Sequence, residues 1–306
     1  MDRIRNLLKI FIINILSKRY VDYLRLQKKK WRHVKYRLRQ KVHPVNISQD
    51  ALVMEFKKVG LCNGDKIYFF SAMSKFGYIE GGAKSVIAAM EEVVGSDGLI
   101  AMPAFPIVGS GIDYVERGSV FNVLKTPSNM GTITETFRQM PNVFRSLHPT
   151  HSICAKGNGA RSLTEGHENC QTPFGYGSPF MKMIEQNMIL VGFGVGVQHF
   201  TLYHTFEDIC GERFPFKVYL DQLFPLRCID ENGVEKIVYT PVHNPSLSIN
   251  RIDSNHKKER QIREMLQSGG YLRTIKVSKG EILAINSSDF ISELNRFLKI
   301  GITIYD

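Results

Sequence analysis

Short apolar strand-like runs alternate with helix-like segments from residue 46 onward, and this alternation is the feature that most restricts the fold. Residues 66–70 and 99–105 are short and rich in β-branched, aromatic and other apolar side chains, which indicates buried strands. Residues 83–94, between these two runs, follow a glycine pair and stop at Gly95, as a helix does. Because alternating strands and helices pack in layers, we predict an α/β domain, an α/β/α layered single domain with a central mixed sheet.

The remainder of the chain continues the same pattern. The segment that opens the domain has a helix cap at Ser48 and a stop at Gly60. Farther on, the signals predict a helix from Ser178-Pro179, a strand over 188–193, a hairpin turning at Glu231-Asn232-Gly233, a charged helix over about 257–267, and a last helix capped by Ser287 or Ser288.

The positive charge is concentrated at the N-terminus. Residues 1–42 carry a net charge of +12, whereas the other residues together carry −1. Apolar residues between Ile4 and Leu16 recur at spacings of three and four, which predicts a basic amphipathic helix. We therefore predict a basic helical extension over 1–45 and an enzyme domain over 46–306. We expect residues 1–42 to bind an anionic membrane surface, with packing on the protein and nucleic-acid binding as alternatives.

Other features narrow the cellular setting. The apolar run from Leu7 to Leu16 is too short to span a bilayer, and no cleavage site of a signal peptide follows it. The five cysteines have no metal-binding spacing, so we expect buried, reduced thiols and no metal. No folded nucleic-acid motif is found, so we expect no nucleic-acid partner. We predict a cytoplasmic protein that can attach to the inner face of the membrane, and a homodimer as an alternative assembly.

One helix-like segment carries a candidate general base. Thr201, His204 and Glu207 are spaced by three, so on a helix they share one broad face. A carboxylate beside a histidine fixes the imidazole tautomer and supports its protonated form, which suits a base that deprotonates an amine or a hydroxyl. A solvent-facing ion pair on an amphipathic helix has the same spacing and remains an alternative.

Two further segments place polar residues beside apolar runs. Residues 146–157 contain His148, His151 and Ser152 close together, which is typical of a site wall or of a hydrogen-bonded core histidine. Residues 71–83 run from a strand end through small hydroxyl residues to a glycine pair at a helix start. Free backbone N–H groups there could hold phosphate or amide oxygens, and a plain capping turn is the alternative.

Taken together, these segments resemble the antibiotic N-acetyltransferase family, whose best-known members are the aminoglycoside 3-N-acetyltransferases. Six motifs occur in order over roughly residues 46–210. They are SAMSKFG with EGGA at 71–83, GLIAMPAF at 98–105, TPS with MG at 126–131, residues 146–157, PFG with SP at 173–179, and LVG at 190–192 leading to the helix of Thr201, His204 and Glu207.

The resemblance implies direct transfer of an acetyl group from acetyl-CoA to an amine, without a metal and without a covalent enzyme intermediate. It implies that His204 is the general base, that Glu207 orients it, and that Thr201 lies beside the thioester. His148 and Ser152 would line the same cleft. The cofactor-binding residues implied by the resemblance are Ser71, Met73, Ser74, Phe76, Gly77, Met130, Ser152 and Phe174.

Departures from the family pattern bear on the acceptor. The resistance enzymes are similar in holding a polycationic drug with acidic residues in their C-terminal third, whereas residues 239–253 here are poor in acids and contain His243, Asn244 and Arg251. A polycation finds little charge complementarity in that stretch. We therefore expect a small-molecule amino-sugar acceptor, nucleotide- or lipid-linked, in surface-polysaccharide synthesis. An aminoglycoside 3-N-acetyltransferase that confers drug resistance is the first alternative, and a binding protein with an inactive fold is the second.

Overall fold

The computed structural model describes residues 27, 31, 46–248 and 251–305. The chain divides into two units, Met1–Val45 and Asn46–Asp306. Apart from residues 27 and 31, the first unit lies outside the described residues, and so do the predictions of a basic helix and of membrane binding. Within the described ranges, no helix is both long and apolar enough to cross a membrane.

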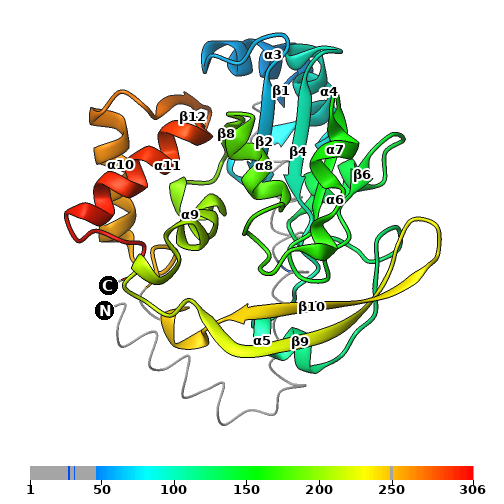
Figure 1. Cartoon of the computed structure of the whole chain (residues 1–306). Helices are drawn as coiled ribbons and strands as arrows, with labels where there is room; N and C mark the ends of the chain where they lie inside the picture. Colours follow the sequence, from blue (N-terminus) through cyan, green and yellow to red (C-terminus); the bar gives the residue numbers. More distant parts are fainter. Residues whose placement is uncertain (1–26, 28–30, 32–45, 249–250, 306) are drawn as a thin grey trace. The chain divides into compact units, whose positions relative to one another are not determined.

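The second unit is built around a seven-stranded mixed sheet (Figure 1). Strand β2 lies at its centre and pairs in parallel with β4 on one side and β8 on the other. The outer neighbours pair in antiparallel fashion. The strands, in their order across the sheet, are β11 (Arg273–Val277), β12 (Gly280–Asn286), β8 (Ile189–Phe193), β2 (Lys66–Ser71), β4 (Leu99–Pro103), β7 (Ile153–Gly157) and β6 (Phe144–Arg145).

Helices cover both faces of this sheet because successive strand residues point to opposite sides. In β2, Ile67 and Phe69 join the apolar core on one face, whereas Tyr68 and Phe70 join the core on the other. The first core is completed by α3 (Gln49–Lys58), α4 (Ala83–Val94) and α6 (Thr132–Arg138), and the second by α7 (Ala160–Thr164), α8 (Pro179–Glu185), α9 (Leu202–Cys210), α10 (His256–Ser268) and α11 (Ser287–Lys299). The predicted α/β/α layers with a mixed sheet are confirmed.

Side-chain caps define several of the predicted helix starts. The Ser48 hydroxyl accepts from the N–H of Ala51 at the start of α3, and the Ser178 hydroxyl accepts from that of Met181 at the start of α8. The predicted cap of α11 is wrong, because Ser287 and Ser288 already lie inside the helix and the cap position is Asn286. The Ser287 hydroxyl instead donates to the Met183 carbonyl, which ties α11 to α8.

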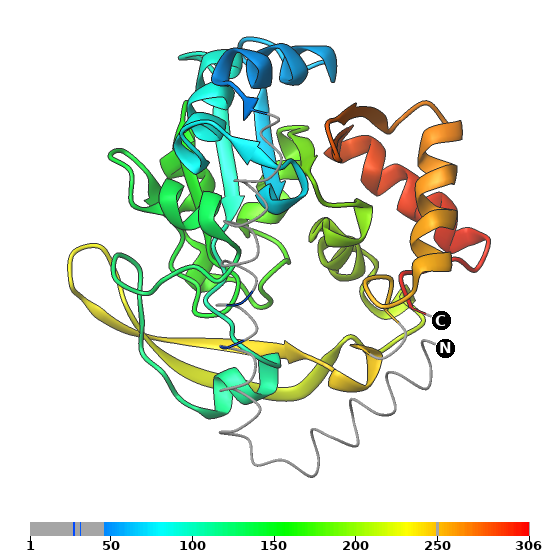
Figure 2. The same cartoon turned by 180° about the vertical axis from the view of Figure 1, so that it is seen from behind.

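A separate ribbon of two long strands carries residues toward α9. Strands β9 (Tyr219–Ile229) and β10 (Glu235–His243) pair in antiparallel fashion, and both views show them as an arm below the main sheet (Figures 1 and 2). The predicted hairpin is confirmed, with strands longer than expected. The pairing register shifts between Pro241 and His243, so His243 pairs with Tyr219 at the end of the ribbon. Such a bulge re-aims a side chain, and here both rings meet α9.

Candidate active site

Helix α9 places a histidine and a carboxylate in direct contact. His204 Nδ1 lies 2.8 Å from Glu207 Oε2, and the Glu207 side chain is only 1% exposed. Burial alone would raise the pKa of Glu207, but the neighbouring His204 and His243 outweigh this effect and lower it to about 2. An ionised carboxylate only accepts hydrogen bonds, so Nδ1 carries the proton and His204 Nε2 is an acceptor, here of a hydrogen bond from Arg251 Nη1 at 3.4 Å.

His243 is a further member of the site that the sequence argument did not assign. Its Nε2 lies 3.7 Å from Glu207 Oε2, and its ring centroid is 4.2 Å from that of His204. Burial, and then the proximity of His204, lower the pKa of His243 to about 4, so its ring is neutral at pH 7. No local spacing predicts this contact, because the β9–β10 ribbon and its bulge bring His243 to α9 from 36 residues farther along the chain.

Thr201 lies directly before α9 and joins the helix to the sheet. Its Oγ1 is 3.1 Å from the hydroxyl of Tyr68, a fully buried residue of the central strand β2. This contact positions Thr201 on the same side of the helix start as His204, and both residues line one cavity. The three residues predicted from their spacing are therefore brought together.

The cavity at His204, here called the base-side cavity, has a volume of about 230 Å³. Among the described residues its lining contains no carboxylate. Arg251 is its one guanidinium, and its Nη1 donates to His204 Nε2 at 3.4 Å, so Nε2 is directed toward a residue of the cavity lining. The predicted residues Met130 and Phe174 line it with Thr201 and His204, as do Phe105 and His151.

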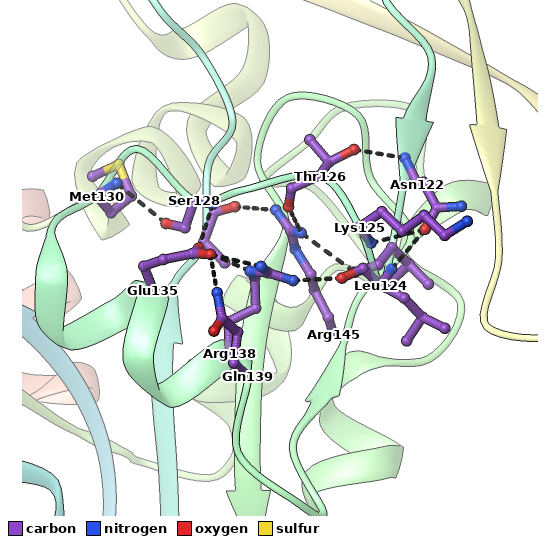
Figure 3. Close-up of polar contacts among 12 residues, drawn as sticks. Asn122, Leu124, Lys125, Thr126, Ser128, Met130, Glu135, Arg138, Gln139 and Arg145 are labelled. Carbon is purple, nitrogen blue, oxygen red and sulfur yellow. Dashed lines mark hydrogen bonds and ion pairs between the residues drawn. The ribbon is translucent and has the colours of Figure 1, made fainter. Parts of the chain in front are cut away.

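The loop that carries Met130 is fixed by partly buried charged side chains (Figure 3). The Glu135 carboxylate accepts from the Ser128 N–H at 2.7 Å and from the Arg138 guanidinium, and the Ser128 hydroxyl accepts from the Met130 N–H. Arg145 holds the same loop by donating to the carbonyls of Val123 and Thr126. Each of these contacts restrains the backbone, so the wall of the base-side cavity at Met130 is preorganised.

A second, larger cavity borders the same helix at Glu207 and Asp208. Its volume is about 1040 Å³, and it is here called the acid-lined cavity. Four carboxylates and one lysine occur in its described lining, which gives it a negative balance. They are Glu207, Asp208, Glu212 and Asp221, with Lys217.

Several predicted site residues lie elsewhere. His148 is fully buried behind the base-side cavity, where its Nδ1 accepts from the N–H of His151. The Ser152 hydroxyl is buried, donates to the Ala104 carbonyl and accepts from Arg145. These bonds give both side chains a structural setting, and neither is among the residues that line the base-side cavity.

The 71–77 loop is also separate from the base-side cavity. Ser71 ends β2, and Met73 and Ser74 form a short 3₁₀ turn that is half-buried to exposed. Phe76 packs in the core against Phe193, with ring centroids 3.7 Å apart, so it supports the loop from below. Gly77 has a φ of 82°, a backbone conformation that suits glycine.

The residues around the base offer three potential metal-ligand atoms. Ligand atoms of His204, Glu207 and His243 lie within 4.8 Å of one another. In the present geometry His204 Nδ1 is hydrogen-bonded to Glu207, which is the arrangement that an oriented base requires. The contact between His204 and Glu207 is thus that of a base with its orienting carboxylate, while Glu207 Oε1 and His243 Nε2 are buried without a hydrogen-bond partner among the described residues.

Fold and site together define a class of protein: a layered α/β enzyme in which a buried carboxylate orients a histidine base at the wall of a small cavity. A family model described as aminoglycoside 3-N-acetyltransferase matches residues 69–299. The chain belongs to this aminoglycoside 3-N-acetyltransferase family. The predicted family is thus confirmed, and so are its enzyme class, N-acetyltransferase, and its co-substrate, acetyl-CoA.

Curated relatives agree with this assignment. Aminoglycoside N(3)-acetyltransferase VII of Streptomyces paromomycinus is 28% identical over 184 residues, which are 55% of this chain and 64% of the relative. The prophage-derived aminoglycoside N(3')-acetyltransferase-like protein YokD of Bacillus subtilis is 27% identical over 197 residues, 58% of this chain and 70% of YokD. The match thus spans just under two thirds of the first relative and slightly more of the second.

Solved structures show the same fold. AAC-IIIb in a binary complex with CoASH aligns with a TM-score of 0.70 at 19% identity, over 85% of this chain and 99% of that one. AAC-VIa bound to sisomicin aligns with a TM-score of 0.69 at 18% identity, over 83% of this chain and 98% of that one.

The predicted acceptor, a nucleotide- or lipid-linked amino sugar of polysaccharide synthesis, is wrong. The relatives are aminoglycoside N-acetyltransferases, which supports the first alternative of the sequence analysis. The physical reason lies in where the acids are. Residues 239–253 are acid-poor, but the carboxylates of the acid-lined cavity come from α9 and from residues 212–221, which that argument did not consider.

Proposed function

We propose that this protein transfers the acetyl group of acetyl-CoA to an amine of an aminoglycoside-type acceptor. The observation that carries the proposal is the hydrogen bond between His204 Nδ1 and the buried Glu207 carboxylate, with Nε2 facing the base-side cavity. The names of the relatives and the sisomicin complex of AAC-VIa support the class of acceptor. The negative balance of the acid-lined cavity suits a polycation.

In this proposal the acceptor nitrogen attacks the thioester carbonyl directly. His204 Nε2 removes the proton from the attacking amine, the C–N bond forms, and the C–S bond breaks to release CoA as the thiol or thiolate. Glu207 holds the imidazole in the required tautomer and stabilises the imidazolium that results. Thr201 lies beside the thioester, where its hydroxyl can donate to the carbonyl oxygen as negative charge develops.

The donor side of the proposal assigns residues by position. Met130 and Phe174 contact the acetyl and pantetheine end in the base-side cavity, whose described lining has no carboxylate. Ser71, Met73, Ser74 and Gly77 contact more distant parts of CoA. Phe76 contributes by supporting that loop, and His148 and Ser152 contribute by holding the wall behind the base.

The decisive experiment compares turnover by the wild type and by His204→Ala. Release of CoA thiol is followed with acetyl-CoA and sisomicin or gentamicin. The substitution should lower kcat by about 10²- to 10⁴-fold, because a positioned base contributes that much, and should leave CoA binding largely intact. His256→Ala, an exposed histidine at the start of α10, is the matched control and should keep wild-type turnover.

Two results would contradict the proposal. Equal turnover by His204→Ala and the wild type would show that the histidine is not the base. A wild-type protein that binds acetyl-CoA but acetylates no aminoglycoside would remove the acceptor assignment.

For the N-terminal extension we propose attachment of residues 1–42 to an anionic membrane surface, on the strength of the +12 charge of that segment. Co-sedimentation with anionic vesicles should fall sharply when residues 1–42 are deleted and when salt is raised. Equal vesicle binding by the full chain and by the variant without residues 1–42 would contradict membrane attachment. The extension would then pack on the enzyme domain or form a homodimer, and light scattering distinguishes these two by molecular mass.

A further inference from the structure

Arg251 is the cation of the base-side cavity, and the proposed reaction gives it no role. Its Nη1 donates at 3.4 Å to His204 Nε2, the atom that must accept the proton of the attacking amine. Among the residues described in the cavity lining there is no lysine and no second arginine. Burial lowers the pKa of His151 and of His199, the other two histidines of this lining, so neither adds a positive charge at pH 7.

Asp253 holds the guanidinium at two points and leaves one nitrogen for the cavity. Arg251 Nε donates to Asp253 Oδ1 at 3.0 Å, and Nη2 donates to Oδ2 at 3.1 Å. Burial alone would lower the pKa of Arg251, but the bonded Asp253 outweighs this effect and raises it, so the side chain stays charged. Nη1 is the remaining nitrogen of the fork, and its partner among the described residues is His204.

The backbone around Arg251 is tied to the C-terminal segment and to α10. The Ile252 N–H donates to the Ile304 carbonyl at 2.8 Å, and the Arg251 carbonyl accepts from the Ser254 N–H at 2.8 Å. The same turn leads into Asn255, whose side chain caps the start of α10. These bonds restrict the guanidinium to the neighbourhood of the base.

The bond between Arg251 and His204 has to break before the base can act. An unprotonated imidazole nitrogen has one lone pair, so Nε2 cannot accept from Nη1 and from the amine at the same time. Once the amine takes this place, Nη1 is a partly buried donor without an acceptor, which is unfavourable. The attacked carbonyl carbon approaches to about 3–3.5 Å from the amine nitrogen, so its oxygen becomes negative close to the released Nη1.

We propose that Arg251 Nη1 exchanges His204 Nε2 for the thioester oxygen and, with the Thr201 hydroxyl, stabilises the negative charge that develops there. As the amine proton passes to Nε2, the C–N bond forms and an electron pair of the carbonyl moves onto the oxygen. The pair returns as the C–S bond breaks and the sulfur leaves with the bonding electrons. This inference rests on the proposed function and makes Arg251 a catalytic residue, so the acid-poor stretch 239–253 supplies a cation to the donor side.

The test uses the full chain and Arg251→Met, which keeps the apolar stem and removes the donors. With acetyl-CoA and sisomicin, kcat should fall by about 10- to 100-fold, at or below the usual loss of an oxyanion donor because Arg251 is only partly buried. The KM of either substrate should change little, since the contact forms in the transition state. Arg251→Lys keeps the charge and should recover part of the lost kcat.

Arg227→Met is the matched control. Arg227 is an exposed arginine of β9 that binds Glu235 through Nε and Nη2, the same two atoms that Arg251 uses for Asp253. It lines neither cavity, and its replacement should leave kcat at the wild-type value.

A double variant identifies the atom that Arg251 contacts. Because Arg251 and Thr201 donate to the same oxygen, combining Arg251→Met with Thr201→Val should lower kcat by less than the product of the two single losses, as for groups that act as a unit. A loss equal to that product would place Arg251 on another atom and overturn the proposed role.

Wild-type kcat in Arg251→Met would also overturn it, and a raised kcat would show that Arg251 only covers the base. Arg251→Gln can still donate to Asp253 and is assayed in the same way should Arg251→Met fail to fold. Hydrolysis of acetyl-CoA without an acceptor passes through the same oxyanion. If the wild type acetylates no aminoglycoside but Arg251→Met lowers hydrolysis, the proposed function fails and the role of Arg251 stands; equal hydrolysis would then remove both.

Discussion

The two cavities beside α9 differ in charge while sharing one helix. The base-side cavity meets the helix at Thr201 and His204 and has no carboxylate in its described lining, whereas the acid-lined cavity meets it at Glu207 and Asp208. Residues three or four positions apart lie on one face of an α-helix, so the two cavities border this face at successive turns along the helix axis. A thioester suits the first cavity and a polycation the second.

The two members of the catalytic pair, His204 and Glu207, border different cavities. Glu207 belongs to the lining of the acid-lined cavity and bonds to His204, which belongs to the lining of the other. The imidazole is therefore oriented from one cavity and acts in the other. Substitutions on the two sides should consequently separate into effects on kcat and effects on acceptor KM.

The largest expected effect comes from substituting Glu207, which lines the acid-lined cavity and orients His204 in the other. Glu207→Gln should lower kcat by about 10²-fold or more, because an amide can donate to Nδ1 and so favours the wrong tautomer of His204. Acceptor KM should change far less. Steady-state kinetics with sisomicin measure both values, and a variant with altered KM but normal kcat would contradict the division.

A smaller effect is expected from Thr201→Val on the base-side cavity. The substitution removes a hydroxyl that lies 3.1 Å from the Tyr68 hydroxyl and that can donate to the thioester oxygen. We expect a fall in kcat of about 10-fold or more, with sisomicin binding unchanged. Thr201→Ser keeps the hydroxyl and should restore most of the turnover. Equal rates for the Val and Ser variants would exclude the hydroxyl from the reaction.

The partly buried charge in the acid-lined cavity should also affect the free energy of unfolding. Burial raises the pKa of Asp208 from 3.8 to about 6 in the folded state, so the folded protein loses stability as pH rises through that range. Asp208→Asn should therefore be more stable than the wild type by at most ~3 kcal/mol at pH 8, with the advantage disappearing near pH 4. Urea unfolding at several pH values measures this difference. A variant that is less stable at pH 8 would show that the hydrogen bonds to the carboxylate outweigh its burial.

The smallest effect is expected from Asp221→Asn. This carboxylate is exposed and already paired with Lys217, so its removal should change acceptor KM by about 2-fold or less, and only at low salt. Measured beside Asp208→Asn, it tests whether the cavity acts through its overall charge or through one partly buried group. A large effect of Asp221→Asn would favour the overall charge.

Local signals in the sequence were sufficient for most of the fold. Residues 83–94 form α4 as predicted, and the predicted strand 66–70 became β2 with one more residue, because apolar period, glycine stops and serine caps act over a few residues. The predicted cap of α11 was wrong, because the Ser287 hydroxyl donates a hydrogen bond to the Met183 carbonyl of another helix. A side-chain partner 104 residues away leaves no trace in a local pattern.

The catalytic pair shows the same division between local and long-range information. The spacing of His204 and Glu207 determined that their side chains could meet, since three residues in a helix bring them together. Only the tertiary structure decided that the pair is buried, that His243 joins it from β10, and that Asp208 faces a cavity with Thr172 and Tyr219. Burial and long-range contacts determine the charge states of these groups, and both depend on how distant segments pack rather than on any residue's neighbours in the chain.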